Sequence, residues 1–385
     1  MSARSSQLLI VQPYVPSYRV PLFRRMKAEL LTQGIQLKVA AAPATGMDKS
    51  RADDQTTEVA DFVLPIRRIQ FGAKALVWKS LSTILRDYRP DLIVVEQAIK
   101  NLESWLPLLS QRLPNRPHVA MWGQGRAYST PQSQMEARVR LWLTRQSSWF
   151  FAYTDMGAKY LSENHYPAER ISILWNSNDS EMLRKELTSI HPEEVEGFRR
   201  RRGLTKGRTA LFLGGVDSRK GIRFLLDTAH HVAESLPDFT LVVAGTGDSV
   251  GEVLSEEDRG GPVRFLGRVD GREKAIALSA CDILMVPEWV GLVAIDALVA
   301  GKPLATTEHP SHSPEFEYLT LGTNSIITEH RIHEYAAGVT SLLIDKSRLR
   351  MMSEACVADS ALLTINGMTD RFVAGIVEWR QASQE

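Results

Sequence analysis

A pair of cations between glycines is the first group whose spacing suggests chemistry. Residues 214–222 read Gly-Gly-Val-Asp-Ser-Arg-Lys-Gly-Ile, between an apolar run and an amphipathic stretch. Backbone N–H groups at a glycine turn that leads into a helix attract anions. Arg219 adds a forked cation and Lys220 a mobile one, which suits a diphosphate. The pattern indicates an anion site whose turn holds Gly214 and Gly215, although a tight turn with two solvated cations would read the same way.

A second group follows another apolar run. Glu288 lies in a loop, and Gly291 opens a mostly apolar helical stretch. The first N–H groups of that helix, near Leu292 and Val293, are unpaired within the helix and can face an anion. Asp296 lies about one turn further along, where a buried carboxylate costs free energy unless it is hydrogen-bonded. Ligand hydroxyls or protein donors could supply that bond.

Alternating elements must position these groups. Short apolar runs typical of buried strands alternate with helical stretches. In the first half they are residues 7–11, 37–41, 91–95, 118–122, 149–152 and 171–174. In the second half they are residues 210–213, 240–244, 263–266, 282–286 and 303–306. This rhythm predicts an α/β fold of two doubly wound, Rossmann-like domains facing a cleft, with ligands beyond the carboxyl ends of the strands.

The domain boundaries follow from the same pattern. We expect residues 1–178 to form an N-terminal domain and the charged residues 179–208 a linker with a short surface helix. Residues 209–364 are expected to form a second domain of the same kind. Residues 365–385 are expected to form a C-terminal helix that can return to the N-terminal domain.

Composition excludes several classes. The 385 residues contain 46 Lys and Arg against 45 Asp and Glu, so a dedicated nucleic-acid binder is not expected. The two cysteines, Cys281 and Cys356, form no metal-ligand or disulfide pattern and suit a reducing, cytoplasmic compartment. The longest stretch without a charged residue is Ser5–Tyr18, shorter than the roughly 20 residues of a membrane-spanning helix.

Together these segments resemble the retaining glycosyltransferases of the GT-B fold, most closely glycosyltransferase family 4. The segments that carry the resemblance are 210–221, Gly245-Thr246-Gly247, Phe265-Leu266-Gly267, Glu288, Gly291-Leu292-Val293, Asp296-Ala297, Gly301-Lys302-Pro303, Pro314-Glu315 and Gly322-Thr323-Asn324. Asn176-Ser177-Asn178-Asp179 is similar to the family's Asn-Gly-x-Asp at the domain junction. The resemblance covers most of residues 170–330.

The resemblance implies that residues 1–178 bind the acceptor and residues 209–364 bind the nucleotide sugar, and it also implies roles for single residues. Glu288 would face the donor sugar, Asp296 would contact the ribose, and Lys220 with Arg219 would hold the diphosphate as the bond to the sugar breaks. The donor-binding set would be Gly214, Gly215, Gly245, Gly267, Gly291, Leu292, Val293 and Asp296. The donor would be a UDP- or GDP-linked sugar, with no further cofactor. No Asp-x-Asp motif is present, so no metal is expected.

Three departures from the family pattern stand out. The usual second glutamate of the family's paired motif is Asp296, one methylene shorter, and Gly215 stands where an Arg is usual; Arg219 could compensate. Many members place a His after the fifth strand, whereas this chain has Gln124 nearby.

The acceptor side is less defined. Tyr14, Tyr18 and Arg19 follow the first strand and, with Gln124, are candidates for acceptor contact; packing of the two tyrosines against their loop is the alternative. A basic helix from Tyr18, with Arg24, Arg25 and Lys27, could lie on an anionic membrane or pack on the core.

The expected function is therefore retaining transfer of a sugar from a nucleotide-diphosphate sugar to a hydroxyl, in bacterial glycan or glycolipid synthesis. The acceptor would be a carbohydrate or a lipid-linked group. The protein would be cytoplasmic, with peripheral contact to the inner face of the plasma membrane left open. The alternatives are a sugar-nucleotide epimerase of the same fold and a non-catalytic scaffold that binds a sugar nucleotide.

Overall fold

The structure is a computed structural model of the 385-residue chain. It describes residues 5–45, 53–71, 74–128 and 133–383, without the side chains of residues 66–79. The chain divides into two compact units. Unit 1 comprises residues 1–127, 131–176 and 365–385, and unit 2 comprises residues 128–130 and 177–364.

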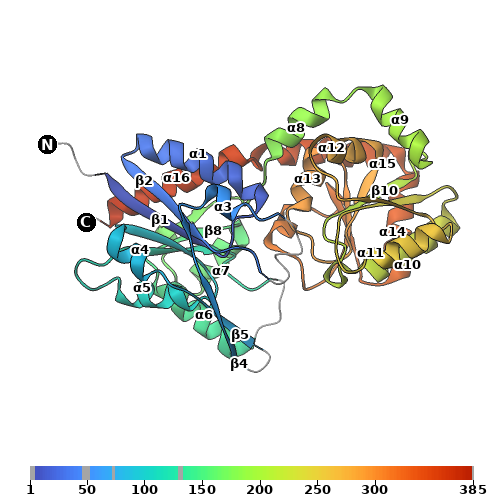
Figure 1. The fold of residues 1–385 in the computed structure, drawn as a ribbon. Helices are drawn as coiled ribbons and strands as arrows, with labels where there is room; N and C mark the ends of the chain where they lie inside the picture. Colours follow the sequence, from blue (N-terminus) through green and yellow to red (C-terminus); the bar gives the residue numbers. More distant parts are fainter. Residues whose placement is uncertain (1–4, 46–52, 72–73, 129–132, 384–385) are drawn as a thin grey trace. The chain divides into compact units, whose positions relative to one another are not determined.

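Unit 1 is built on a parallel sheet of seven strands in the order β3-β2-β1-β6-β7-β8-β9 (Figure 1). Its strands are β1 (Ser6–Gln12), β2 (Ile35–Ala41), β3 (Phe62–Val63), β6 (Leu92–Glu96), β7 (His118–Gly123), β8 (Trp149–Ala152) and β9 (Ile171–Ile173). An antiparallel pair, β4 (Ile66–Phe71) and β5 (Lys74–Lys79), lies outside this sheet. Its helices are α1 (Val20–Thr32), α3 (Thr56–Val59), α4 (Ser82–Asp87), α5 (Trp105–Ser110), α6 (Gln134–Gln146), α7 (Asp155–Glu163) and α16 (Ile365–Ala382), with 3₁₀ turns η1 (Ser17–Arg19), η2 (Leu102–Ser104) and η3 (Ala168–Arg170).

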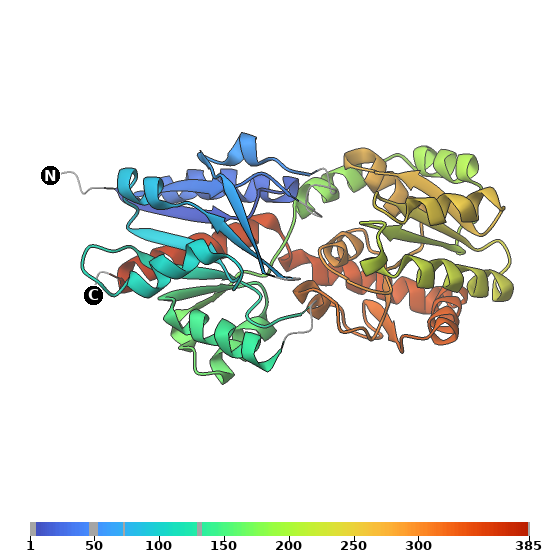
Figure 2. The same ribbon diagram turned by 60° about the horizontal axis from the view of Figure 1, so that its bottom comes forward.

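The last helix closes the core of unit 1. In Figures 1 and 2, α16 (red) lies beside α1 (blue). Its buried face includes Phe372 and Trp379, and the Trp379 Nε1 donates to Ser148 Oγ at 2.9 Å. Phe372 packs edge-on against Trp122 and at a tilt against Phe151 of the sheet, with ring centres 5.0 and 4.5 Å away. Residues 365–382 are therefore an integral part of unit 1.

Unit 2 carries a parallel sheet of six strands in the order β12-β11-β10-β13-β14-β15. The strands are β10 (Thr209–Leu213), β11 (Thr240–Ala244), β12 (Val263–Gly267), β13 (Ile283–Met285), β14 (Leu304–Thr307) and β15 (Ser325–Thr328). The helices are α8 (Ser180–Ser189), α9 (Pro192–Arg202), α10 (Ile222–Ser235), α11 (Val250–Asp258), α12 (Gly271–Ala280), α13 (Val293–Val299), α14 (Ile332–Ile344) and α15 (Lys346–Asp359), with 3₁₀ turns η4 (Ser218–Lys220), η5 (Pro314–Tyr318) and η6 (Ser360–Leu362). The strand order is that of a doubly wound Rossmann-like sheet.

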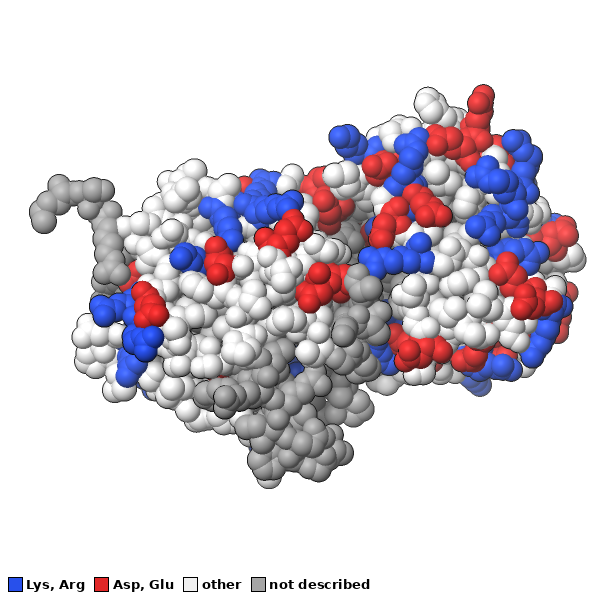
Figure 3. Space-filling view, in the orientation of Figure 1, with Lys and Arg blue, Asp and Glu red and all other residues white. Residues whose placement is uncertain are grey.

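The predicted fold class is thus confirmed in each unit. All eleven strands expected from the sequence are present, and β10, β11 and β13 are buried along their full length. The stretch 179–208 holds two helices, α8 and α9, which pack on α12 within unit 2. None of the helices in the described residues is both long and apolar enough to span a bilayer. On the face shown in Figure 3, acidic and basic side chains lie intermixed.

Candidate functional site

The site lies where the strand order of unit 2 reverses. β10 pairs in parallel with both β11 and β13, so β10 and β13 are neighbours although two strands separate them in the chain. Crevices at the carboxyl ends of such strand pairs bind ligands in open α/β sheets. Lys220 follows β10 and Glu288 follows β13. The topology therefore brings the two predicted groups to one edge of the sheet.

Lys220 and Glu288 meet through their loops. The Lys220 ammonium donates a hydrogen bond to the carbonyl oxygen of Trp289. The Glu288 carboxylate packs against the start of α10: a Cβ added at Gly221 would lie 2.6 Å from Glu288 Oε1. Gly221 also has φ 64°, a left-handed conformation that favours glycine. A glycine at position 221 is thus required both by its own backbone and by the carboxylate next to it.

Arg219 is engaged by a neighbouring carboxylate. Its guanidinium donates to both oxygens of Asp217, at 3.0 and 2.8 Å, and lies over the Trp289 ring at 5.3 Å. The hydrogen bond from Arg219 lowers the pKa of Asp217, so this carboxylate is ionised at neutral pH. The charge of Arg219 is therefore largely offset by Asp217, and Lys220 is the stronger candidate for an anion.

The predicted glycines differ in the structural reason why a side chain would or would not fit at each position. A Cβ at Gly245 would lie only 1.7 Å from the Gly214 carbonyl oxygen, so the turns after β10 and β11 pack backbone against backbone. At Gly215 the nearest atom would be Asp217 Oδ2, at 2.9 Å. Gly267 has φ 72° and open space around it. At Gly291 the nearest atom would be at an ordinary 3.5 Å, so the protein itself has room for a side chain there.

His312 holds the loop that carries Glu288. The Val290 N–H donates to His312 Nδ1 at 3.0 Å, and His312 Nε2 donates to the Thr307 carbonyl at 2.8 Å. These bonds fix one neutral tautomer, because Nδ1 accepts and Nε2 donates. The ring stacks on Phe316 at 4.3 Å, and burial lowers the pKa of His312 to about 4. His312 is only 6% exposed, so it is a buried part of the site's support.

Two further histidines surround Glu288. His309 Nε2 lies 3.7 Å from Glu288 Oε2, and His330 Nε2 lies 3.4 Å from Glu288 Oε1. Burial lowers the pKa of His330, while the Glu288 charge opposes that shift. Neither histidine was predicted from the sequence to belong to the site. His309 follows an expected strand, which was a usable signal, whereas β15, which precedes His330, was not expected at all.

The helix after Glu288 is short and buried. α13 has seven residues, all buried, with Leu292 before its first residue, Val293. Asp296, 8% exposed, accepts hydrogen bonds from Asn178 Nδ2 at 3.1 Å and Lys274 Nζ at 3.2 Å. Protein donors thus satisfy one carboxylate oxygen, which is one of the two alternatives left open by the sequence. The Asn178 Oδ1 atom is buried and, among the described residues, has no hydrogen-bond partner.

The candidate acceptor residues belong to unit 1. Arg19 is 3% exposed; its Nη2 donates to Asn176 Oδ1 at 2.6 Å, and its guanidinium lies 4.8 Å from the Trp122 ring centre. Tyr18 lies against the same guanidinium, at 5.1 Å, and Tyr14 is 8% exposed. Gln124 is half-buried. Arg19 is therefore a core residue of unit 1, and of these four Gln124 and Tyr18 retain partial exposure.

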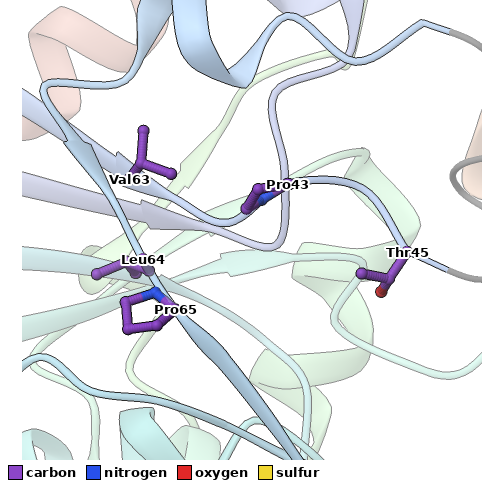
Figure 4. Close-up of a pocket in the computed structure, with 5 residues that line it drawn as sticks. All are labelled: Pro43, Thr45, Val63, Leu64 and Pro65. Carbon is purple, nitrogen blue, oxygen red and sulfur yellow. The ribbon is translucent and has the colours of Figure 1, made fainter.

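A hollow in unit 1 is lined by Pro43, Thr45, Val63, Leu64 and Pro65 (Figure 4). Its lining is almost entirely apolar, and Thr45 contributes the one side-chain hydroxyl in view. A site for a charged diphosphate needs cations and hydrogen-bond donors. This hollow is therefore not a candidate for the nucleotide.

Solved structures of known proteins share the two-unit fold of this chain. Solved structures that share the fold include HepE (Alr3699) of Anabaena in complex with UDP, with a TM-score of 0.70 and 16% identity, covering 97% of this chain and 100% of that one. They also include WaaG, a glycosyltransferase involved in lipopolysaccharide biosynthesis, with a TM-score of 0.63 and 15% identity, covering 95% and 98% of the two chains. The fold is therefore GT-B, with two Rossmann-like units.

Sequence comparison finds a family match in unit 2 and relatives that are glycosyltransferases. Residues 207–345 match the family "Glycosyl transferases group 1". A phosphatidyl-myo-inositol mannosyltransferase of Mycobacterium leprae is 38% identical over 110 residues, a segment that spans 26% of this chain and only 29% of that relative. A 2-deoxystreptamine glucosyltransferase of Streptomyces kanamyceticus is 24% identical over 73% of this chain and 78% of its own length. The chain therefore has the GT-B fold, and residues 207–345 of unit 2 are similar to the group 1 glycosyltransferases.

Proposed function

We propose that the chain transfers a sugar from a UDP- or GDP-linked donor to a hydroxyl acceptor, with retention at the anomeric carbon. The observation that carries this proposal is the placement of Lys220 and Glu288 at the switch point of the unit 2 sheet, inside the group 1 domain. The solved HepE complexes contain UDP and UDP-glucose, which supports a nucleotide sugar as the donor.

Each group has a distinct role in the proposed mechanism. As the bond to the sugar breaks, negative charge grows on the leaving diphosphate and positive charge on the sugar. Lys220 stabilises the diphosphate with a charge-assisted hydrogen bond, and Glu288 orients the sugar and stabilises its positive charge. The carbonyl of Trp289 keeps the ammonium beside the Glu288 loop. The acceptor hydroxyl gives up its proton to the departing phosphate oxygen.

We propose a glycan or lipid-linked acceptor, because one relative is named for phosphatidyl-myo-inositol and a structural neighbour for lipopolysaccharide biosynthesis. The chemistry uses no group from outside the chain and the two substrates. The protein would work in the cytoplasm, in peripheral contact with the membrane when the acceptor is a lipid.

Two substitutions test the roles. Lys220→Ala should weaken binding of the free nucleoside diphosphate by roughly 10- to 100-fold, since a hydrogen bond to a charged group contributes about 1.5–3 kcal/mol. Glu288→Gln should leave that binding within about threefold but abolish transfer and the slow hydrolysis of the sugar nucleotide. Isothermal titration with UDP and GDP measures the nucleotide affinity of both variants. Release of nucleotide from a panel of sugar nucleotides measures transfer and hydrolysis.

Lys185→Ala is a matched control, because Lys185 is an exposed lysine on α8 of the same unit. It should change neither quantity. An equal loss of nucleotide affinity in Lys220→Ala and Glu288→Gln would contradict the assigned roles. Tight nucleotide binding without any hydrolysis or transfer across the panel would favour the scaffold.

Asp296 and Asn178 give a second test. We propose that a ribose hydroxyl donates to Asn178 Oδ1, the buried acceptor next to the Asn178–Asp296 hydrogen bond. Asp296→Asn removes the negative charge that orients the Asn178 amide and pairs with Lys274. It should weaken nucleoside diphosphate binding by about 3- to 30-fold and should weaken pyrophosphate binding less, because pyrophosphate has no ribose. Equal effects on both ligands would make Asp296 purely structural.

A further inference from the structure

A glutamate and two histidines lie close together in the loops that follow three neighbouring strands of unit 2. Glu288 follows β13, His309 follows β14 and His330 follows β15, and these strands are adjacent and parallel. One ligand atom from each of the three side chains lies within 4.8 Å of the other two. The three side chains are 16%, 24% and 32% exposed, so the cluster is partly shielded from water.

The spacing suits a tetrahedral ion. Bonds of 2.0–2.1 Å to imidazole nitrogen or carboxylate oxygen place tetrahedral ligand atoms about 3.3 Å apart. His330 Nε2 lies 3.4 Å from Glu288 Oε1, and His309 Nε2 lies 3.7 Å from the other carboxylate oxygen, Oε2. One ligand atom from each side chain lies within 4.8 Å of the other two. Rotation of the side chains can therefore bring the ligand atoms to the tetrahedral spacing, and a fourth position would remain for water.

The Thr307 hydroxyl sets the tautomer of His330. The Thr307 hydroxyl donates its single proton to the Pro287 carbonyl at 2.8 Å, so it must accept from His330 Nδ1, at 2.9 Å. The proton of the neutral ring is then on Nδ1, and the Nε2 lone pair faces the Glu288 carboxylate. A metal ion placed between these two electron-rich atoms, which lie 3.4 Å apart, would bind both. Metal-bound histidines are commonly oriented in this way by an acceptor at the other ring nitrogen.

Ser311 holds the ring of His309. His309 Nδ1 lies 2.6 Å from Ser311 Oγ and accepts from the Ser311 N–H at 3.3 Å. An ion bound at Nε2 uses the lone pair of that nitrogen, so the ring proton must then lie on Nδ1 and be donated to Ser311 Oγ in place of the backbone bond. The rings of His309 and His330 lie 4.9 Å apart at 56°, so their Nε2 atoms converge on Glu288 from two directions. Phe224 stacks on His330 at 4.3 Å and limits the movement of its ring.

We propose that Glu288, His309 and His330 form a binding site for a divalent ion of the Zn²⁺ class, which imidazole and carboxylate ligands favour. The bound ion occupies the carboxylate that would otherwise face the donor sugar, so metal and sugar nucleotide compete. The metal site stands on the geometry alone, whereas the competition rests on the proposed function. The ion is thus an inhibitory ligand of this chain and takes no part in the transfer.

The metal site is tested on the full chain, freed of metal by a chelator. Zn²⁺ is titrated against a chromogenic chelator, and Co²⁺ is added separately for its visible absorption. The wild type should bind one equivalent tightly and show the intense absorption of four-coordinate Co²⁺. His309→Ala and His330→Phe should each weaken Zn²⁺ binding at least tenfold and lose that absorption. The phenyl ring of the second variant retains the stacking on Phe224.

A matched control uses an adjacent imidazole pair of unit 2 that lies outside the proposed site. The rings of His231 and His333 lie 4.5 Å apart, and the double variant His231→Ala/His333→Ala should keep the wild-type affinity. Zn²⁺ should also raise the unfolding temperature of the wild type and of this control, but not that of His330→Phe. Wild-type affinity in His309→Ala and His330→Phe, or binding that the His231/His333 control abolishes, would overturn the metal site.

The competition is tested on protein loaded with one equivalent of Zn²⁺. The probe is whichever of UDP-glucose and GDP-mannose binds the metal-free chain, together with the matching nucleoside diphosphate. Zn²⁺ should weaken the sugar nucleotide at least threefold and leave the diphosphate nearly unchanged. Unchanged affinity for the sugar nucleotide would overturn the competition and leave the metal site intact. If no sugar nucleotide of the panel binds the metal-free chain, the proposed function fails on its own.

Discussion

The buried, neutral imidazole of His312 holds a loop of the candidate site. Its burial makes the free energy of unfolding depend on pH. The pKa of His312 in the folded chain is about 4, whereas an exposed histidine titrates near 6.5. Between those values the unfolded chain binds a proton that the folded chain does not. The free energy of unfolding therefore falls as pH falls from about 6.5 to about 4, by at most about 1.4 kcal/mol per pH unit from this residue.

The substitution His312→Leu should remove that part of the pH dependence. At pH near 7 it should also cost about 1–3 kcal/mol, because the Val290 N–H loses its acceptor. Urea denaturation near pH 7 and near pH 5 measures both effects. His165→Asn is the control: His165 is exposed with φ 62°, a conformation that Asn tolerates, so its pH slope should match the wild type. Equal slopes in wild type and His312→Leu would contradict the argument.

Among single residues, the sequence predicted those that directly follow a strand better than it predicted contacts between side chains of different loops. Lys220 and Glu288 lie in short loops directly after expected strands, so parallel topology alone placed them together. The partners of Asp296 could not be found in this way, because Asn178 lies 118 residues and Lys274 22 residues away. His309 and His330 reach Glu288 from two further loops, and only the order of strands β13, β14 and β15 brings them there.

At the scale of elements, α16 shows how a single glycine allows a helix to dock. A Cβ at Gly375 would lie 2.2 Å from Ser172 Oγ, which itself accepts from Trp149 Nε1 at 2.9 Å. Gly375→Ala should therefore lower the free energy of unfolding by about 1–3 kcal/mol, although alanine favours an isolated helix. Gly251→Ala in α11, where a Cβ meets nothing within 4 Å, should leave stability unchanged or raise it. Chemical denaturation compares the two; a stabilised Gly375→Ala would contradict the close docking.

The elements that the sequence missed have physical reasons. β15 has four residues, and its apolar core is only Ile326-Ile327, too short for a pattern to emerge without its neighbour β14. Residues 179–208 were expected to be a linker with one short helix, but they form the two helices α8 and α9. Each of these helices buries few residues, so its apolar pattern is weak in the sequence. Their positions are fixed by packing on α12 within unit 2, a contact that the local sequence does not encode.

At the scale of the whole molecule, the net charge of +1 leaves only local patches to attract an anionic membrane. The basic helix predicted for this role is α1. Its apolar residues Leu22, Phe23 and Met26 are fully buried in unit 1. Its cations are paired: Arg24 with Glu58, Arg25 with Glu29 and with Asp370 at 2.9 Å, and Lys27 with Asp61 at 2.8 Å. α1 is thus a core-packed helix with a neutralised polar face, which was the alternative to membrane contact.

We therefore expect that replacing Arg24, Arg25 and Lys27 together by Gln does not reduce sedimentation with vesicles rich in anionic lipid. The substitution should instead lower the free energy of unfolding by about 1–3 kcal/mol, because exposed ion pairs contribute about 0.2–1 kcal/mol each. Any vesicle binding by wild type and variant should weaken equally as salt rises, since surface charges are screened over about 8 Å at physiological ionic strength. Sedimentation at low and physiological salt, with denaturation of the same samples, gives both quantities. A folded triple variant that no longer binds vesicles, beside a wild type that does, would restore α1 as the membrane-contacting element.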